Sequence, residues 1–160
     1  MKYFLPEYYY IINDPKASID DKKAASKSIY DAYNEYEKYL QKHKRLFSKS
    51  FLEEYKKSGF HDYEIQNINF DFENIKRGKA LNITICIKHN QEIYHFVHKD
   101  VKNCTASLND LSNLFLSDYL YGEFYKNNDN LWNHNFLFGY DYEINIECKK
   151  FVFCKEINNK

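Results

Sequence analysis

The sequence predicts an α+β protein in which N-terminal helices, one of them long, pack on a C-terminal antiparallel β-sheet. Two patterns lead to this fold class. Between residues 20 and 47 apolar residues recur every three or four positions, which is the spacing of one helix face. Beyond Gly59 apolar residues alternate with polar ones, which is the spacing of half-buried strands.

Length and composition indicate one folded domain. A chain of 160 residues has the size of a single domain. Only 4 glycines and 2 prolines are present, which excludes a linker-rich or collagen-like chain. We therefore expect residues 1–160 to form one domain, with a helical part over residues 1–59 and a sheet part over residues 60–160.

Charge and hydropathy exclude several classes of protein. The 23 lysines and arginines balance 23 acidic residues, whereas a protein that binds nucleic acid through charge carries a basic excess. A mean hydropathy of −0.74 and the lack of a long apolar run exclude a transmembrane helix. Pro6 and Glu7 interrupt the apolar start, which is therefore not a secretory signal. We expect a cytoplasmic protein that binds neither nucleic acid nor membrane.

Two helices are expected before residue 48. A proline at the first helical position favours a short helix over residues 6–12. Ser18 or Asp20 can cap the long helix, which is expected to run from about residue 20 to 47. The aromatic segment Tyr8–Ile12 is too apolar for water, and we expect it to cover part of the long helix.

A third, shorter helix should close the helical part of the chain. Ser50 starts a capping-box pattern, and the helix should end near Lys57, whose charge suits the negative C-terminal end. Gly59 is the expected left-handed residue after it.

The sheet part should begin with an antiparallel hairpin that turns at residues 76–79. The alternating apolar residues are Ile68, Phe70 and Phe72 in the first strand, and Leu81, Ile83, Ile85 and Ile87 in the second. Ile65 is out of phase with them, which predicts a bulge near Gln66. Two further strands are expected, over residues 93–97 and 101–105.

The last third of the chain shows the clearest alternation. The expected segments are, in order, a stretch with helical spacing whose state stays open (108–118), a strand (119–125), a polar loop (127–135), a long strand (136–148) and a last strand (151–157). Lys149 and Lys150 are expected to form the turn between the last two strands.

The cysteines point to structural thiols. Cys86, Cys104, Cys148 and Cys154 contain no C-x-x-C pair, so neither a zinc knuckle nor a thioredoxin-like motif is present. Because the cytoplasm keeps thiols reduced, we expect four free cysteines. With a turn at Lys149 and Lys150, Cys148 would pair with Phe151 and lie on the face opposite to Cys154.

No motif indicates a cofactor, a metal or a catalytic centre. A P-loop, a dinucleotide-binding glycine pattern, a nucleophile elbow and an H-E-x-x-H motif are all absent from the sequence. His89, His95 and His98 suggest a metal site, but residues three apart on a strand point to opposite faces. We therefore expect surface and edge-strand histidines and no metal.

A few residues remain as candidates for binding. His61 and Asp62 follow the Gly59 cap, where they can satisfy backbone groups or join a catalytic cluster. Glu123 lies among aromatic residues, and tyrosine and tryptophan are enriched at binding hot spots, although a core role is the alternative. The candidate binding residues are His61, Asp62, Tyr121, Glu123, Tyr125 and Trp132.

Short motifs along nearly the whole chain suggest a family. They are the opening Met1–Phe4, the Tyr- and Glu-rich helix 20–47, Phe60-His61-Asp62, Tyr121–Tyr125, Tyr142-Glu143 and the last strand 151–157. In these motifs the chain resembles a domain of unknown function from Gram-positive bacteria, with Phe60 in place of the family's usual leucine and Tyr63 in place of a small polar residue. The resemblance implies no established activity. Similar His-Asp-led sheet domains occur among toxin-immunity proteins, which act by binding.

Together these observations predict a non-enzymatic protein-binding module, immunity-like or regulatory, with another protein as its partner. The chain itself is expected to be a monomer or a homodimer. The alternative is a small-ligand-binding protein or an enzyme that uses His61, Asp62 and Glu123, which requires the three groups to converge on one substrate position.

Overall fold

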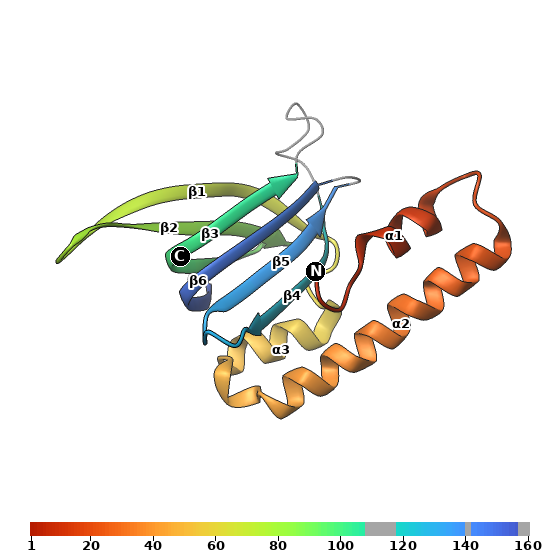
Figure 1. Ribbon diagram of the computed structural model, residues 1–160, viewed down its shortest axis with the longest axis horizontal. Coiled ribbons are helices and arrows are strands. Elements are labelled where there is room, and N and C mark those ends of the chain that lie inside the picture. The colour runs from red at the N-terminus through yellow and green to blue at the C-terminus, as the bar shows by residue number, and fades with distance from the viewer. Residues whose placement is uncertain (108–117, 140–141, 157–160) are drawn as a thin grey trace. The chain divides into compact units, whose positions relative to one another are not determined.

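The computed structural model describes residues 1–107, 118–139 and 142–156, so all but the last residue of the stretch with helical spacing at 108–118 lies outside the described residues. Three α-helices precede six antiparallel strands in this part of the chain, which confirms the predicted α+β class (Figure 1). None of the described helices is long and apolar enough to cross a membrane. The chain forms two compact units, Met1–Phe47 and Ser48–Lys160.

The first unit consists of two helices and one helical turn. Helix α1 spans Pro6–Asn13 and helix α2 spans Ile19–Lys42, followed by the 3₁₀ turn η1 at Lys44–Leu46. Ser18 is the N-cap of α2, and its Oγ accepts a hydrogen bond from the backbone nitrogen of Asp21 at 3.1 Å. The long helix therefore ends about five residues earlier than predicted, because the backbone leaves helical geometry before η1.

The N-terminal segment packs on the long helix, as predicted. Helix α1 contacts α2, and the residues before α1 add two aromatic rings to this contact. The ring centroids of Tyr3 and Phe4 lie 5.1 and 5.7 Å from that of Tyr36, which is fully buried. Aromatic pairs at such distances stabilise the fold beyond the area that they bury.

Deleting residues 1–13 is therefore expected to lower the free energy of unfolding of the first unit by about 2 kcal/mol, because the aromatic face of α2 loses its cover. Thermal unfolding and light scattering measure this effect, with aggregation as the visible consequence. A truncated protein that matches the full chain in melting temperature and stays monodisperse would contradict the described packing.

The second unit begins with helix α3, Lys49–Ser58. Its N-cap is Ser48, two residues before the predicted start, and its C-terminal Gly59 adopts the predicted left-handed conformation with φ 62°. Phe51 points from α3 to the strands, with its ring centroid 5.0 Å from that of Phe124. This helix thus packs on the sheet, whereas packing of the long helix on the sheet stays a prediction.

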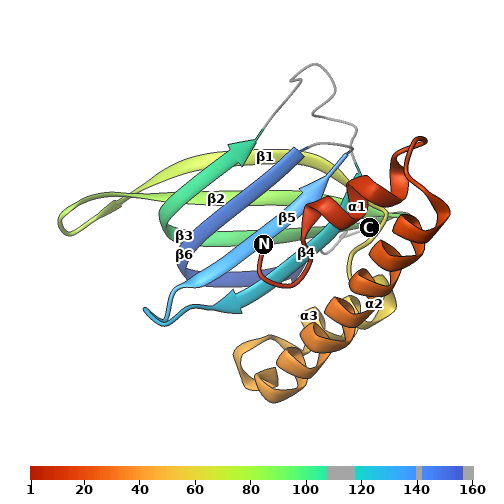
Figure 2. The ribbon, with the colours of Figure 1, turned by 45° about the vertical axis from the view of Figure 1, so that its right-hand side comes forward.

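Six strands form a closed antiparallel barrel in the order β1-β2-β3-β6-β5-β4 (Figure 2). The strands are β1 Tyr63–Ile75, β2 Gly78–His89, β3 Glu92–Ser107, β4 Asp118–Lys126, β5 Trp132–Phe138 and β6 Tyr142–Lys155. The predicted first hairpin and its bulge are confirmed, since the register of β1 shifts between Ile65 and Asn67. The barrel closes through two residue pairs of β1 and β4, Tyr63 with Tyr119 and Glu64 with Asp118.

Aromatic side chains fill the barrel. The fully buried rings on the strands and beside them are those of Phe51, Phe60, Tyr63, Tyr94, Phe96, Tyr119, Phe124, Phe136 and Phe138. Phe96 lies among them, with its ring centroid 5.0 Å from that of Phe60 and 5.2 Å from that of Phe124. The abundant phenylalanine and tyrosine of the sequence thus supply much of the core.

The prediction of one long strand over 136–148 is wrong, because the segment contains the end of β5 and the start of β6. Phe138 pairs with Tyr142 across the hairpin, and Gly139 begins the connection with φ 57°. The polar loop is shorter than predicted, since β5 begins at Trp132.

The predicted turn at Lys149 and Lys150 is also wrong, because β6 continues through both residues. Cys148 therefore pairs with Val101 of β3 rather than with Phe151. The two strands predicted over 93–97 and 101–105 are likewise one strand, β3. All four cysteines are free.

Candidate functional site

The barrel encloses a chain of three polar side chains. His98 of β3, His134 of β5 and Tyr119 of β4 are each at most 1% exposed. The prediction of a surface or edge-strand position for His98 is therefore wrong, and His134 does not lie in a loop. One sequence signal could have placed both, because His98 continues the alternation of Tyr94 and Phe96, and His134 begins that of Phe136 and Phe138.

The hydrogen bonds of this chain fix both histidine tautomers. The carbonyl oxygen of Ile83 can only accept, so His98 Nδ1 carries the hydrogen of their 3.1 Å bond. In the neutral ring Nε2 of His98 then accepts from His134 Nδ1 at 2.9 Å. His134 Nε2 is left as the acceptor for the Tyr119 hydroxyl, 3.2 Å away. Each hydrogen bond is therefore donated in the same direction along the chain, from Tyr119 to His134, from His134 to His98 and from His98 to Ile83.

Burial keeps both rings neutral. Desolvation lowers the pKa of His98 from its ordinary value of 6.5 to about 4, although the bond to the Ile83 carbonyl acts in the opposite direction. Desolvation also places the pKa of His134 well below its ordinary value, and His98 adds to this effect. Aromatic rings enclose the pair, with the centroid of Phe124 3.8 Å from that of His134. This buried chain is a stabilising part of the core rather than a substrate site.

The structure brings His61, Asp62 and Tyr121 together. His61 Nδ1 lies 2.8 Å from Asp62 Oδ1, and the rings of His61 and Tyr121 are 5.5 Å apart. Burial, followed by the charge of Asp62, raises the pKa of Tyr121. The backbone nitrogen of Asp62 also donates to the Tyr119 carbonyl at 3.0 Å, so this residue helps to hold β1 against β4. The side chains of His61 and Asp62 contact each other and are 39% and 73% exposed, so the prediction that they satisfy backbone groups at this junction stays a prediction.

Glu123 and Tyr125 meet at Asn135. The amide nitrogen of Asn135 lies 3.2 Å from both the Glu123 carboxylate and the Tyr125 hydroxyl. Glu123 is fully buried and shares one face of β4 with Tyr121 and Tyr125, since the three alternate along the strand. Trp132 belongs to the opposite face, where its ring lies 5.6 Å from that of Phe151. The six predicted residues are thus placed on both faces of the sheet.

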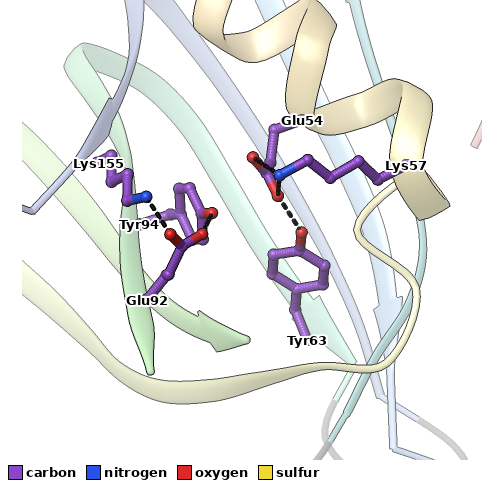
Figure 3. A network of polar contacts seen from close by, with 6 residues as sticks. All are labelled: Glu54, Lys57, Tyr63, Glu92, Tyr94 and Lys155. Atoms are coloured by element: carbon purple, nitrogen blue, oxygen red, sulfur yellow. Dashed lines mark hydrogen bonds and ion pairs between the residues drawn. The ribbon is translucent and has the colours of Figure 1, made fainter. Parts of the chain in front are cut away.

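A second polar network anchors α3 to the strands (Figure 3). Glu54 of α3 accepts from Lys57 at 2.8 Å and from the hydroxyl of Tyr63 on β1. Burial opposes ionisation of Glu54, yet these two donors hold its pKa below the ordinary value, while burial and Glu54 raise the pKa of Tyr63. Figure 3 shows a parallel group nearby, in which Glu92 accepts from Tyr94 and Lys155.

Glu54 and Glu92 each accept hydrogen bonds from neighbouring side chains. The bonds of Glu54 explain how α3 is held on β1. It offers no preformed metal site: within residues 1–107, 118–139 and 142–156, no three His, Cys, Asp or Glu side chains are grouped to hold a metal ion.

The far part of the β1–β2 hairpin presents a different surface. Figure 1 shows this hairpin extending past the other strands of the barrel. β1 pairs with β2 along residues 64–75, but within the described residues it pairs with β4 only at Tyr63 and Glu64. Residues 67–75 therefore have one backbone edge that no described strand pairs with, which we call the open edge.

The open edge carries exposed aromatic side chains. Phe70 and Phe72 are 58% and 67% exposed. Phe70 pairs with Ile83 and Phe72 with Leu81, so both continue the apolar inner face of the barrel along the hairpin. The alternation of apolar residues in β1 predicted that Phe70 and Phe72 lie on a buried face. This is wrong for residues 67–75, because no described strand other than β2 lies beside them.

Comparison of the chain with models of known families, with characterised proteins and with solved structures found no match. The family resemblance of the sequence motifs therefore stays a prediction. The function is proposed below from the surfaces of the chain itself.

Proposed function

We propose that this protein is a protein-binding module that takes up an extended segment of a partner at the open edge of β1. The observation that carries the proposal is the combination of a strand edge to which no described residue is paired with Phe70 and Phe72 exposed beside it. Addition of a strand to a sheet edge supplies backbone hydrogen bonds, and pockets or apolar surface beside the edge supply selectivity. A cytoplasmic immunity or regulatory protein, which acts by binding, would use such a surface.

The geometry of the hairpin tells which amides the partner would meet. A two-residue turn joins β1 to β2, and the residues that flank such a turn exchange both backbone hydrogen bonds. Ile75 and every second residue before it then bond to β2. The residues that direct their backbone groups outward are Ile68, Phe70, Phe72 and Asn74.

The alternative predicted from the sequence, a ligand-binding or catalytic site of His61, Asp62 and Glu123, receives less support. His61 and Asp62 are in contact, but Glu123 accepts its hydrogen bond from Asn135. That alternative stays a prediction.

Selection of peptides from a random display library on the full-length protein tests the proposal. We expect the enriched peptides to protect the amides of Phe70 and Phe72 from hydrogen exchange, and to bind at least tenfold more weakly to Phe72→Ser. Because Phe72 is exposed, this change should leave the fold intact.

The matched control is Tyr30→Ser, which removes an aromatic side chain of similar exposure, 66%, from α2. This variant is expected to bind the selected peptides like the native protein. A selection that enriches no peptide, peptides that ignore the Phe72 substitution, or amides at the open edge that are already protected in the free protein would each overturn the proposal.

A further inference from the structure

The two faces of the open edge differ in charge. The inner face carries Phe70 and Phe72, whereas the outer face carries Asp71 and Glu73, which alternate with them. From Tyr63 to Ile75 the strand contains acidic residues but no lysine, arginine or histidine. The strand partners of Asp71 and Glu73 on β2 are the neutral Asn82 and Ala80. The basic residues near this end of the strand are Lys76 and Arg77 in the turn and Lys79 of β2, which pairs with Asn74 on the face of Phe70 and Phe72.

The carboxylates face an added strand at short range. In an antiparallel pair, residues directly opposite have Cβ atoms about 5 Å apart on the same face, and opposite charges there stabilise the pair. The side-chain nitrogen of Asn82 donates a hydrogen bond to Glu73 Oε2 at 3.1 Å. A strand that places apolar side chains over Phe70 and Phe72 necessarily places its alternate residues opposite Asp71 and Glu73.

We infer that the segment taken up at the open edge alternates apolar residues with lysine or arginine. This inference rests on the proposed function and adds the chemistry of the partner. Each basic residue opposite a carboxylate strengthens binding by roughly threefold, so two of them produce about a tenfold preference over a neutral segment. The attraction is screened by salt, because both carboxylates are exposed.

A second copy of this chain fits the same edge poorly. If two β1 strands paired antiparallel with their apolar faces together, Asp71 and Glu73 of both copies would share the outer face. Four carboxylates would then face one another without a basic residue among them, which is destabilising. The acidic face thus protects the open edge against self-association and favours a basic partner.

Binding of three labelled peptides to the full-length protein tests the inference. Each peptide alternates valine with a second residue, which is lysine, serine or glutamate. We expect the lysine peptide to bind about tenfold more tightly than the serine peptide and the glutamate peptide to bind most weakly. Raising the salt concentration should reduce the difference.

Two paired variants identify the groups responsible. Asp71→Asn/Glu73→Gln should abolish the preference for lysine, and Asp71→Lys/Glu73→Lys should reverse it. The control Glu35→Gln/Glu37→Gln removes from α2 two exposed carboxylates that are also two positions apart in the sequence. This variant should keep the preference for lysine. A control that behaves like the Asp71 and Glu73 variants would show non-specific attraction and overturn the inference.

The outcomes separate the inference from the proposed function. If the three peptides bind equally, and all lose binding in Phe72→Ser, the charge preference is wrong while the proposed function stands. If no peptide binds and the display selection also enriches none, the proposed function itself fails. A dimer in sedimentation that Phe72→Ser dissociates would show that a second copy occupies the edge, and would overturn the inference.

Discussion

Replacing Gly122 by alanine is expected to lower the free energy of unfolding by about 4 kcal/mol. A Cβ atom at this position would lie 1.4 Å from the hydroxyl oxygen of Tyr119 and 2.3 Å from its Cζ. Tyr119 is fully buried, and its ring is stacked on that of Phe136 with centroids 5.4 Å apart. The ring cannot move without loss of packing and of the hydrogen bond to His134, so overpacking and an unsatisfied acceptor act together.

Chemical denaturation of Gly122→Ala measures this effect, and Gly78→Ala is its control. A Cβ at Gly78 meets nothing within 4 Å, although φ there is 107°. Gly78→Ala should therefore cost only the backbone strain, about 1–2 kcal/mol. The pair Tyr119→Val/Gly122→Ala should be less destabilised than the sum of its single changes. A Gly122→Ala protein within 1 kcal/mol of the native one would show that the Tyr119 ring does not lie as described.

Stability is expected to fall between pH 6.5 and about 4 because His98 and His134 fold as neutral rings. In the unfolded chain a histidine has its ordinary pKa of about 6.5, whereas His98 in the barrel has a pKa of about 4. Between these values the unfolded chain binds more protons, so the free energy of unfolding decreases as the pH falls. A shift of this size corresponds to about 3 kcal/mol for His98 alone, and His134 shifts in the same direction.

Denaturation midpoints at a series of pH values test this expectation. Carboxylates with lowered pKa, such as Glu54 and Asp100, lose their contribution at lower pH, so the upper part of the window reports the histidines. The triple change His98→Leu, His134→Phe and Tyr119→Phe removes the whole polar chain and should remove the slope. His43→Gln, which changes a histidine of the first unit, should keep it. In the native protein, titration of either buried ring near pH 6.5 by NMR would refute the explanation without any variant.

The sequence allowed the helices and the first hairpin to be predicted because their signals are local. Capping serines, the left-handed glycine and the change of period act over a few residues. The hairpin between β5 and β6 was not predicted from the sequence, for a physical reason. Its connection has an odd number of residues, from Gly139 to the residue before Tyr142. The alternation of Phe136 and Phe138 therefore continues in phase into β6, and only the glycine marked the turn.

The opposite error arose at Lys149 and Lys150. The buried face of β6 changes phase between Cys148 and Phe151, which both lie inside, and such a break looks like a turn. The paired strand β3 has a matching irregularity at Asp100, where φ is 52° and the side chain forms a 2.7 Å ion pair with Lys149. Both strands bend together, so their pairing survives. A single sequence shows the two breaks but not that they face each other.

The candidate site was predicted only in part. The contact between His61 and Asp62 follows from their adjacency, but the exposure of Phe70 and Phe72 depends on the absence of a described strand beside them. Alternation indicates which residues share a face, whereas exposure is decided by the neighbouring strands, which come from distant parts of the sequence. For the same reason, alternation can place His98 and His134 on the inner face but cannot show that the two rings meet, because β3 and β5 are distant in the sequence.

The short pairing of β1 with β4 divides the barrel into two three-stranded meanders, which the described pairs at Tyr63 and Glu64 join on this side. β1, β2 and β3 form the first meander, and β4, β5 and β6 form the second. A long ladder between β3 and β6 joins them on one side, whereas among the described residues two pairs, of β1 with β4, join them on the other. Releasing Tyr63 and Glu64 from their partners converts the cylinder into an open six-stranded sheet, and every other strand pairing is preserved.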